Sequence, residues 1–162
     1  RLTCRLRHGR DPLRVIVDTK LKLPPTAKAL DPSSQASCLV ACGPKAAAKR
    51  RAALEKAGAG VLELPEGPSG GVDLSALMKE LGRRGITSLL LEGGAGLAWG
   101  FLNQGLIHEI AYFYAPKIIG GKAAPGMIGG AGFGEMAQAV MLDKPRVRRF
   151  GDDFLVQAKI IK

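Results

Sequence analysis

The sequence has few aromatic residues and no long apolar run. No stretch approaches the ~20 consecutive apolar residues of a membrane span, and no signal-like apolar segment follows the basic start at Arg1. Aromatic residues make up only 5% of the chain, and they do not alternate as the stacking surface of an RNA-recognition domain would require. The favoured interpretation is therefore a protein without a membrane or nucleic-acid partner.

Metal-ligating residues are also scarce. The chain has three cysteines and two histidines, which are Cys4, Cys38, Cys42, His8 and His108. Their spacing does not match a zinc site. Cys38 and Cys42 lie too far apart along a predicted strand to form a disulfide readily. These residues predict reduced thiols in a cytoplasmic protein that binds no metal.

The net charge is +10, from 24 basic and 14 acidic residues. Three explanations remain open: a nucleic-acid backbone, an anionic small molecule such as a nucleotide or a phosphosugar, and solvated surface charge. The basic residues are scattered in short groups at 5–10, 20–22, 49–51, 83–84 and 146–149. The charge alone does not choose among the three.

The order of predicted elements indicates the fold class. At 162 residues and 46% hydrophobic content, the chain fits one folded domain. Helices are predicted at 45–57 with Gly58 as a cap, after the capping residue Asp73, and at 95–104. Strands are predicted at 14–18 (continuing to 23), 37–42, 61–64, 88–91, 109–115, 147–150 and 154–161. Alternating strands and helices followed by strands alone predict an α/β fold. We expect a mainly parallel sheet with an antiparallel C-terminal edge and helices on both faces.

A glycine-rich turn is the most informative local feature. The apolar run at 88–91 predicts a strand buried on both faces, and Glu92 and four glycines follow it. Glycines let backbone N–H groups approach a ligand closely, and the helix after them points its positive end to the same place. The pattern suits a phosphate group, with Glu92 accepting hydrogen bonds beside it. A tight turn packed on its neighbours is the alternative.

Three motifs together resemble a known family. Val17-Asp18-Thr19, Leu91-Glu92-Gly93-Gly94 and the segment from Ala115 to Gly121 resemble the pyrimidine reductase domain of riboflavin biosynthesis. The resemblance implies a dihydrofolate-reductase-like fold that binds NADPH. It also implies that residues 1–162 form a single reductase domain lacking the family's N-terminal strand and helix.

The resemblance also implies the site residues. The substrate contacts of the family fall on Leu2, Arg5 and Glu92, and Arg5 would clamp the ribose phosphate. Lys20 and Lys45 either meet the 2′-phosphate of the cofactor or are solvated surface lysines. No side chain is assigned as the catalytic proton donor. The cofactor contacts fall on Thr19, Gly94, Ala95, Gly96, Leu97, Ala98, Trp99 and Gly100.

The implied reaction is the reduction of a ribosylamino-pyrimidine phosphate to its ribitylamino form. The implied partners are this small-molecule substrate, a fused N-terminal deaminase domain absent from the sequence, and a second copy in a homodimer. Two alternatives are open. One is an NADPH reductase of the same superfamily that acts on another pterin or pyrimidine, and the other is a basic nucleic-acid-binding module.

Overall fold

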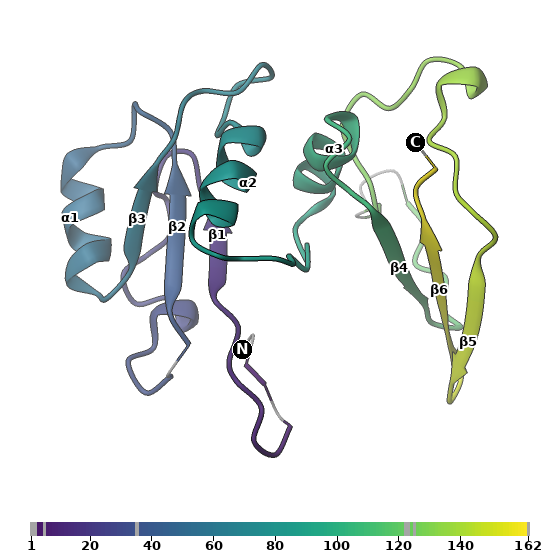
Figure 1. Ribbon diagram of the computed structural model, residues 1–162, viewed down its shortest axis with the longest axis horizontal. Coiled ribbons are helices and arrows are strands. Elements are labelled where there is room, and N and C mark those ends of the chain that lie inside the picture. The colour runs from purple at the N-terminus through teal and green to yellow at the C-terminus, as the bar shows by residue number, and fades with distance from the viewer. Residues whose placement is uncertain (1–2, 5, 35, 122–123, 125, 162) are drawn as a thin grey trace. The chain divides into compact units, whose positions relative to one another are not determined.

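The chain forms two compact units, Arg1–Thr87 and Ser88–Lys162 (Figure 1). The computed structural model describes residues 3–4, 6–34, 36–121, 124 and 126–161. None of the helices in this described part combines the length and the apolar character that a membrane crossing requires.

The first unit is built on a parallel sheet. Its strands are β1 (Arg14–Val17), β2 (Cys38–Cys42) and β3 (Gly60–Glu63), hydrogen-bonded in the order β1-β2-β3. The connection from β1 to β2 contains the short helix η1 (Lys28–Leu30), and helix α1 (Ala48–Lys56) connects β2 to β3. The three arrows run the same way in Figure 1, because β2 pairs in parallel with both β1 and β3.

The core of this unit surrounds β2, whose five residues are all buried. Neighbouring residues of a strand face opposite sides of a sheet. On one side, β2 packs in a cluster of Leu21, Leu30, Cys38, Val40, Cys42, Leu54 and Ala59. On the other side Leu39 and Ala41 are also buried, and helix α2 (Leu74–Arg83) buries three leucines in the same unit. Both faces of β2 are therefore covered.

Two predicted helix ends are confirmed. The Asp73 carboxylate accepts a hydrogen bond from the backbone N–H of Ala76 at 2.9 Å, which satisfies one of the free donors at the start of α2. Gly58 follows α1 with φ of +87°, the left-handed conformation that ends a helix and favours glycine.

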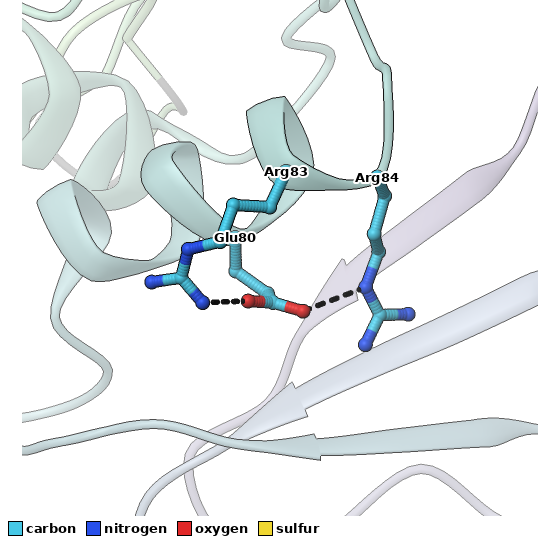
Figure 2. A network of polar contacts seen from close by, with 3 residues as sticks. All are labelled: Glu80, Arg83 and Arg84. Atoms are coloured by element: carbon cyan, nitrogen blue, oxygen red, sulfur yellow. Dashed lines mark hydrogen bonds and ion pairs between the residues drawn. The ribbon is translucent and has the colours of Figure 1, made fainter.

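Glu80 of α2 pairs with two of the basic residues (Figure 2). Its carboxylate accepts from Arg83 and, at 2.9 Å, from the Nε of Arg84. Both arginines lie at the C-terminal end of the helix, where positive charge is favourable. Part of the positive charge is thus used in ion pairs on the surface.

The predicted continuation of the first strand to residue 23 is wrong. The backbone N–H of Leu21 bonds the carbonyl of Asp18 at 3.0 Å, and the Asp18 carboxylate accepts from the N–H of Leu23 at 2.7 Å. Leu21 has φ of +51° and is only 1% exposed. The residues with the alternating pattern therefore form a tight turn, and this turn places the Leu21 side chain in the core.

The second unit is built on an antiparallel sheet. Its strands are β4 (Glu109–Tyr114), β5 (Arg146–Phe150) and β6 (Asp153–Lys159), in the order β4-β6-β5. Helix α3 (Ala95–Asn103) precedes β4, and the short helix η2 (Met136–Gln138) precedes β5. A tight turn at Gly151 and Asp152 joins β5 to β6.

The predicted strand at 88–91 is wrong. The backbone there has no strand assignment, and Leu90 is 77% exposed. A strand forms only where a neighbour accepts and donates its backbone hydrogen bonds, and no described segment pairs with these residues. The strands therefore belong to two separate sheets, parallel first and antiparallel last, and the predicted mixed α/β class is confirmed.

Candidate functional site

The turn before α3 leaves the start of the helix open. Gly94 is the N-cap residue and, without a side chain, makes no capping bond. The first turn of α3 contains no acidic residue. The first backbone N–H groups of a helix have no partner within it, and together with the helix dipole they attract an anion. This end of α3 can therefore receive a negatively charged group.

The glycines of this turn have different roles. A Cβ atom at Gly93 would lie 2.7 Å from Cδ2 of Leu97, so this position needs glycine for close packing. A Cβ atom at Gly94 or at Gly96 would meet nothing within 4 Å. The space above these two residues is open, which fits the close approach of a cofactor phosphate to the backbone.

Glu92 is exposed and directly precedes this turn. An ionised carboxylate only accepts hydrogen bonds, so Glu92 can bind amino or hydroxyl groups of a ligand. Glu92 and the start of α3 belong to the same unit. Glu92 is thus available beside the start of α3, and its role as a ligand contact stays a prediction.

A second glycine-rich segment, residues 126–134, packs on the same helix. The backbone N–H of Gly129 donates to the carbonyl of Ala95 at 2.9 Å. The Trp99 ring packs edge-on against Phe133, with ring centroids 5.0 Å apart. The sequence motifs do not place this segment at the site, although its run of glycines is a usable signal. The structure adds it to the surroundings of α3.

Thr19 lies in the first unit, just past the carboxyl end of β1. The N–H of Gly43, which follows β2, donates to the Thr19 carbonyl at 3.1 Å. A Cβ atom at Gly71 would lie 3.3 Å from Oγ1 of Thr19. Open α/β sheets bind ligands at the carboxyl ends of their strands, so Thr19 occupies a position that suits a cofactor contact.

Lys45 forms an ion pair near the same edge. Its Nζ lies 2.8 Å from Oε2 of Glu66, and both side chains are exposed. The hydrogen bond between them raises the pKa of Lys45 and lowers the pKa of Glu66. A phosphate that bound Lys45 would have to compete with Glu66. Lys20 is exposed, and its carbonyl accepts from Arg50.

The predicted site residues do not all belong to one described unit. Leu2 and Arg5 lie outside the described residues. Thr19 belongs to the first unit, whereas Glu92 and residues 94–100 belong to the second. Within the described ranges, no three side chains of histidine, cysteine, aspartate or glutamate come together as metal ligands.

An apolar hollow at the other end of α3 contains none of the predicted residues. It is lined by Leu102, Gly105, Ile107, Ala139, Val140, Met141, Ile160 and Ile161. Its lining side chains carry no charge or hydrogen-bonding group that could bind a phosphate. The start of α3 is the better candidate for an anionic ligand.

Comparison with known proteins supports the resemblance read from the motifs. The family model described as the RibD C-terminal domain matches residues 1–156. The chain is 34% identical over 149 residues to the 2,5-diamino-6-ribosylamino-4(3H)-pyrimidinone 5′-phosphate reductase of Methanothermobacter thermautotrophicus, covering 92% of this chain and 66% of that protein. It is 33% identical over 159 residues to riboflavin biosynthesis protein RibD of Bacillus amyloliquefaciens, covering 97% of this chain and 42% of that protein.

A solved structure agrees with the fold. The RibD structure of Acinetobacter baumannii (form 2) superposes with a TM-score of 0.71 at 28% identity, covering 97% of this chain and 42% of that one. The chain thus spans about two thirds of one curated relative and less than half of the RibD proteins.

Proposed function

Because the chain belongs to the RibD C-terminal domain family, we propose that it is a reductase of riboflavin biosynthesis. The proposed reaction is the NADPH-dependent reduction of 5-amino-6-(5-phosphoribosylamino)uracil, which converts the ribosyl group to the ribityl form. The observation that carries the proposal is the family match over residues 1–156, which includes Glu92 and the open start of α3. This match favours a reductase over a nucleic-acid-binding module.

We propose that the start of α3 contacts the cofactor. Thr19, in the other unit, stays a separate proposed cofactor contact. The open space above Gly94 and Gly96 and the uncapped N–H groups fit its phosphates. The chemistry supplied by the bound cofactor is hydride transfer to C1′ of the opened ribosyl group. The backbone of this turn then fixes the position of the cofactor, and position and orientation are the main contributions of a protein to such a step.

We propose that Glu92 orients the substrate. As an acceptor, its carboxylate can bind the amino groups of the pyrimidine or the hydroxyl groups of the sugar. Arg5 is the proposed partner of the substrate phosphate, because its planar guanidinium can bind two phosphate oxygens at once. Leu2 completes the proposed substrate contacts.

The decisive experiment follows NADPH oxidation with the phosphoribosylamino-pyrimidine in the full-length protein that carries these residues. Glu92→Gln removes the negative charge and keeps the size of the side chain. We expect it to lower kcat/KM for the pyrimidine by about tenfold, which corresponds to about 1.4 kcal/mol. Glu55→Gln, at an exposed position of α1, is the matched control. Unchanged kinetics in Glu92→Gln would contradict the role of Glu92, and a wild-type protein without NADPH oxidation would contradict the proposed function.

The name of the Methanothermobacter relative favours a second substrate. That protein is named for the 2,5-diamino pyrimidinone, which differs from the uracil compound by an amino group in place of an oxygen on the ring. The same assay with both compounds distinguishes them. A kcat/KM at least tenfold higher for the diamino compound would replace the uracil compound in the proposal. Another pterin or pyrimidine is the remaining alternative, if neither compound is reduced.

The setting of this activity is also a proposal. We propose that the enzyme works as a homodimer in the cytoplasm, and that a deaminase accompanies it. The similarity to RibD proteins, of which the chain spans 42%, supports the deaminase. The three cysteines are free thiols, which supports a reducing compartment.

A further inference from the structure

The glycine-rich segment 126–134 crosses α3 on one face of the helix. Ala95 and Trp99 are four residues apart, so they lie on the same face. The Gly129 N–H donates to the Ala95 carbonyl at 2.9 Å, and a Cβ atom at Gly129 would lie 3.2 Å from the Ala95 Cβ. The segment therefore touches the first turn of α3 along its backbone.

The Trp99 indole occupies the position where a side chain on the next residue would be. A Cβ atom at Gly130 would lie 2.0 Å from Cδ1 of Trp99, a distance that no real contact allows. Gly130 also has φ of +77°, which disfavours any other residue. Phe133 packs on the edge of the same indole. Trp99 thus packs against the segment at two residues, Gly130 and Phe133.

These contacts give the indole a role that its place in the sequence does not indicate. The resemblance assigns position 99 to the cofactor, yet the Trp99 side chain is engaged by Gly130 and Phe133. The first turn of α3 remains open above Gly94 and Gly96. The backbone of the turn and the indole therefore serve different purposes.

We propose that Trp99 is a positioning residue that holds Gly129 and Gly130 against the first turn of α3, where they form a wall of the cofactor site. The inference rests on the proposed function, because it takes the start of α3 as the cofactor site. The wall fixes how closely the cofactor approaches the N–H groups of the turn. Without the indole, the segment loses its packing partner and the wall loses its position.

The chain offers a matched pair of variants for the test. Gly130 and Gly132 lie in the same segment and have φ of +77° and +70°. A Cβ atom at Gly132 would meet nothing within 4 Å, whereas one at Gly130 collides with Trp99. Gly132→Ala therefore introduces only backbone strain. Gly130→Ala introduces backbone strain and a collision of the new Cβ atom with the Trp99 ring.

We expect Gly130→Ala to raise the Kd for NADPH, measured by calorimetry in the full-length protein, about tenfold more than Gly132→Ala does. The KM for NADPH should rise in parallel, with the KM for the pyrimidine unchanged. Trp99 is the only tryptophan, so its emission also reports the displacement. The emission should shift to longer wavelength in Gly130→Ala and stay at the wild-type position in Gly132→Ala.

Variants of Trp99 complete the test. Trp99→Ala should weaken NADPH binding about as much as Gly130→Ala, and Trp99→Phe should restore most of it by keeping an aromatic contact with Phe133. In the Trp99→Ala background, Gly130→Ala should raise the Kd for NADPH no more than Gly132→Ala does, because the indole that an added Cβ atom would meet is absent.

The outcomes separate this inference from the proposed function. If the wild-type protein binds NADPH and the two glycine variants weaken binding equally, the positioning role is wrong and the proposed function stands. If Gly130→Ala lowers thermal stability with the Kd unchanged, Trp99 only packs the fold and the inference is again wrong. A wild-type protein that binds no NADPH overturns both.

Discussion

Phe113 and Phe150 meet across the middle strand of the antiparallel sheet, with ring centroids 6.1 Å apart and planes inclined at 54°. Phe113 comes from β4 and Phe150 from β5, and both strands pair with β6. Leu155 of β6 pairs directly with Phe113 in the register and is only 8% exposed. Leu155 is therefore buried on the middle strand, between the two strands that carry the exposed rings.

Leu155→Ala should destabilise the second unit. The leucine side chain is buried, so its truncation to alanine leaves a cavity. We expect a loss of about 2–3 kcal/mol in the free energy of unfolding, in the range for buried leucines, measured by urea denaturation. Val147→Ala on β5 is the control, since Val147 is 62% exposed. Equal losses in the two variants would show that the burial of Leu155 contributes no more to stability than the exposed Val147 does.

Asp73→Ala should weaken the start of α2. The substitution removes the acceptor of the Ala76 N–H, and loss of such a cap costs about 1 kcal/mol. Thermal unfolding followed by circular dichroism measures the change. Asp152→Ala, in the connection between β5 and β6, provides the comparison. The capping role would be refuted by a midpoint that does not fall further than in Asp152→Ala.

Gly58→Ala and Gly82→Ala should change stability in opposite directions. Gly58 has φ of +87°, where alanine is strained by about 1 kcal/mol. Gly82 lies inside α2 with nothing within 4 Å of an added Cβ atom. Alanine there should stabilise the helix by about 0.5–1 kcal/mol. Chemical denaturation of both variants checks the two signs, and the same sign for both would contradict the assigned conformations.

The buried thiols of Cys38 and Cys42 should make the fold sensitive to alkali. Burial raises the pKa of both thiols above its ordinary value of 9.0. Above that value the unfolded thiols ionise while the folded ones keep their protons, so stability falls as the pH rises towards the folded pKa.

The free energy of unfolding should therefore fall between about pH 9 and the pH at which the folded thiols ionise. The fall should be smaller in Cys42→Ala, whatever that substitution costs at neutral pH. Urea denaturation across the pH range measures both slopes, with Cys4→Ala as the control. Parallel slopes in wild type and Cys42→Ala would exclude the thiol as the cause.

Local signals in the sequence predict most of the elements. The short apolar run at 37–42 predicts a strand, and the structure has that strand as β2. Asp73 and Gly58 mark helix ends through the backbone chemistry of single residues. Such features depend on a few neighbouring positions, so a sequence can indicate them.

The failures concern the turn after β1 and the segment at 88–91. Leu21 alternates with its neighbours as a strand residue would, but a turn bonded by Asp18 places it in the core. The leucines at 88–91 look like a buried strand, and no described segment pairs with them. Pairing partners are distant in the sequence, and a local pattern cannot specify them.

The candidate site was predictable to the same extent. Glu92, Gly94 and Gly96 could be found because the carboxylate, the turn and the helix start are contiguous. The packing of Gly130 on Trp99 could not, because more than twenty residues separate them and only the folded chain brings them together.

The burial of strand β2 determines how rarely its backbone hydrogen bonds break. Every one of its residues is buried, and it is hydrogen-bonded to a strand on each side, whereas every residue of the edge strand β5 is exposed. Amide hydrogens exchange with solvent only when their bonds break, and central strands open last. The amides of Leu39, Val40 and Ala41 should therefore be the slowest to take up deuterium, long after those of β5 have exchanged.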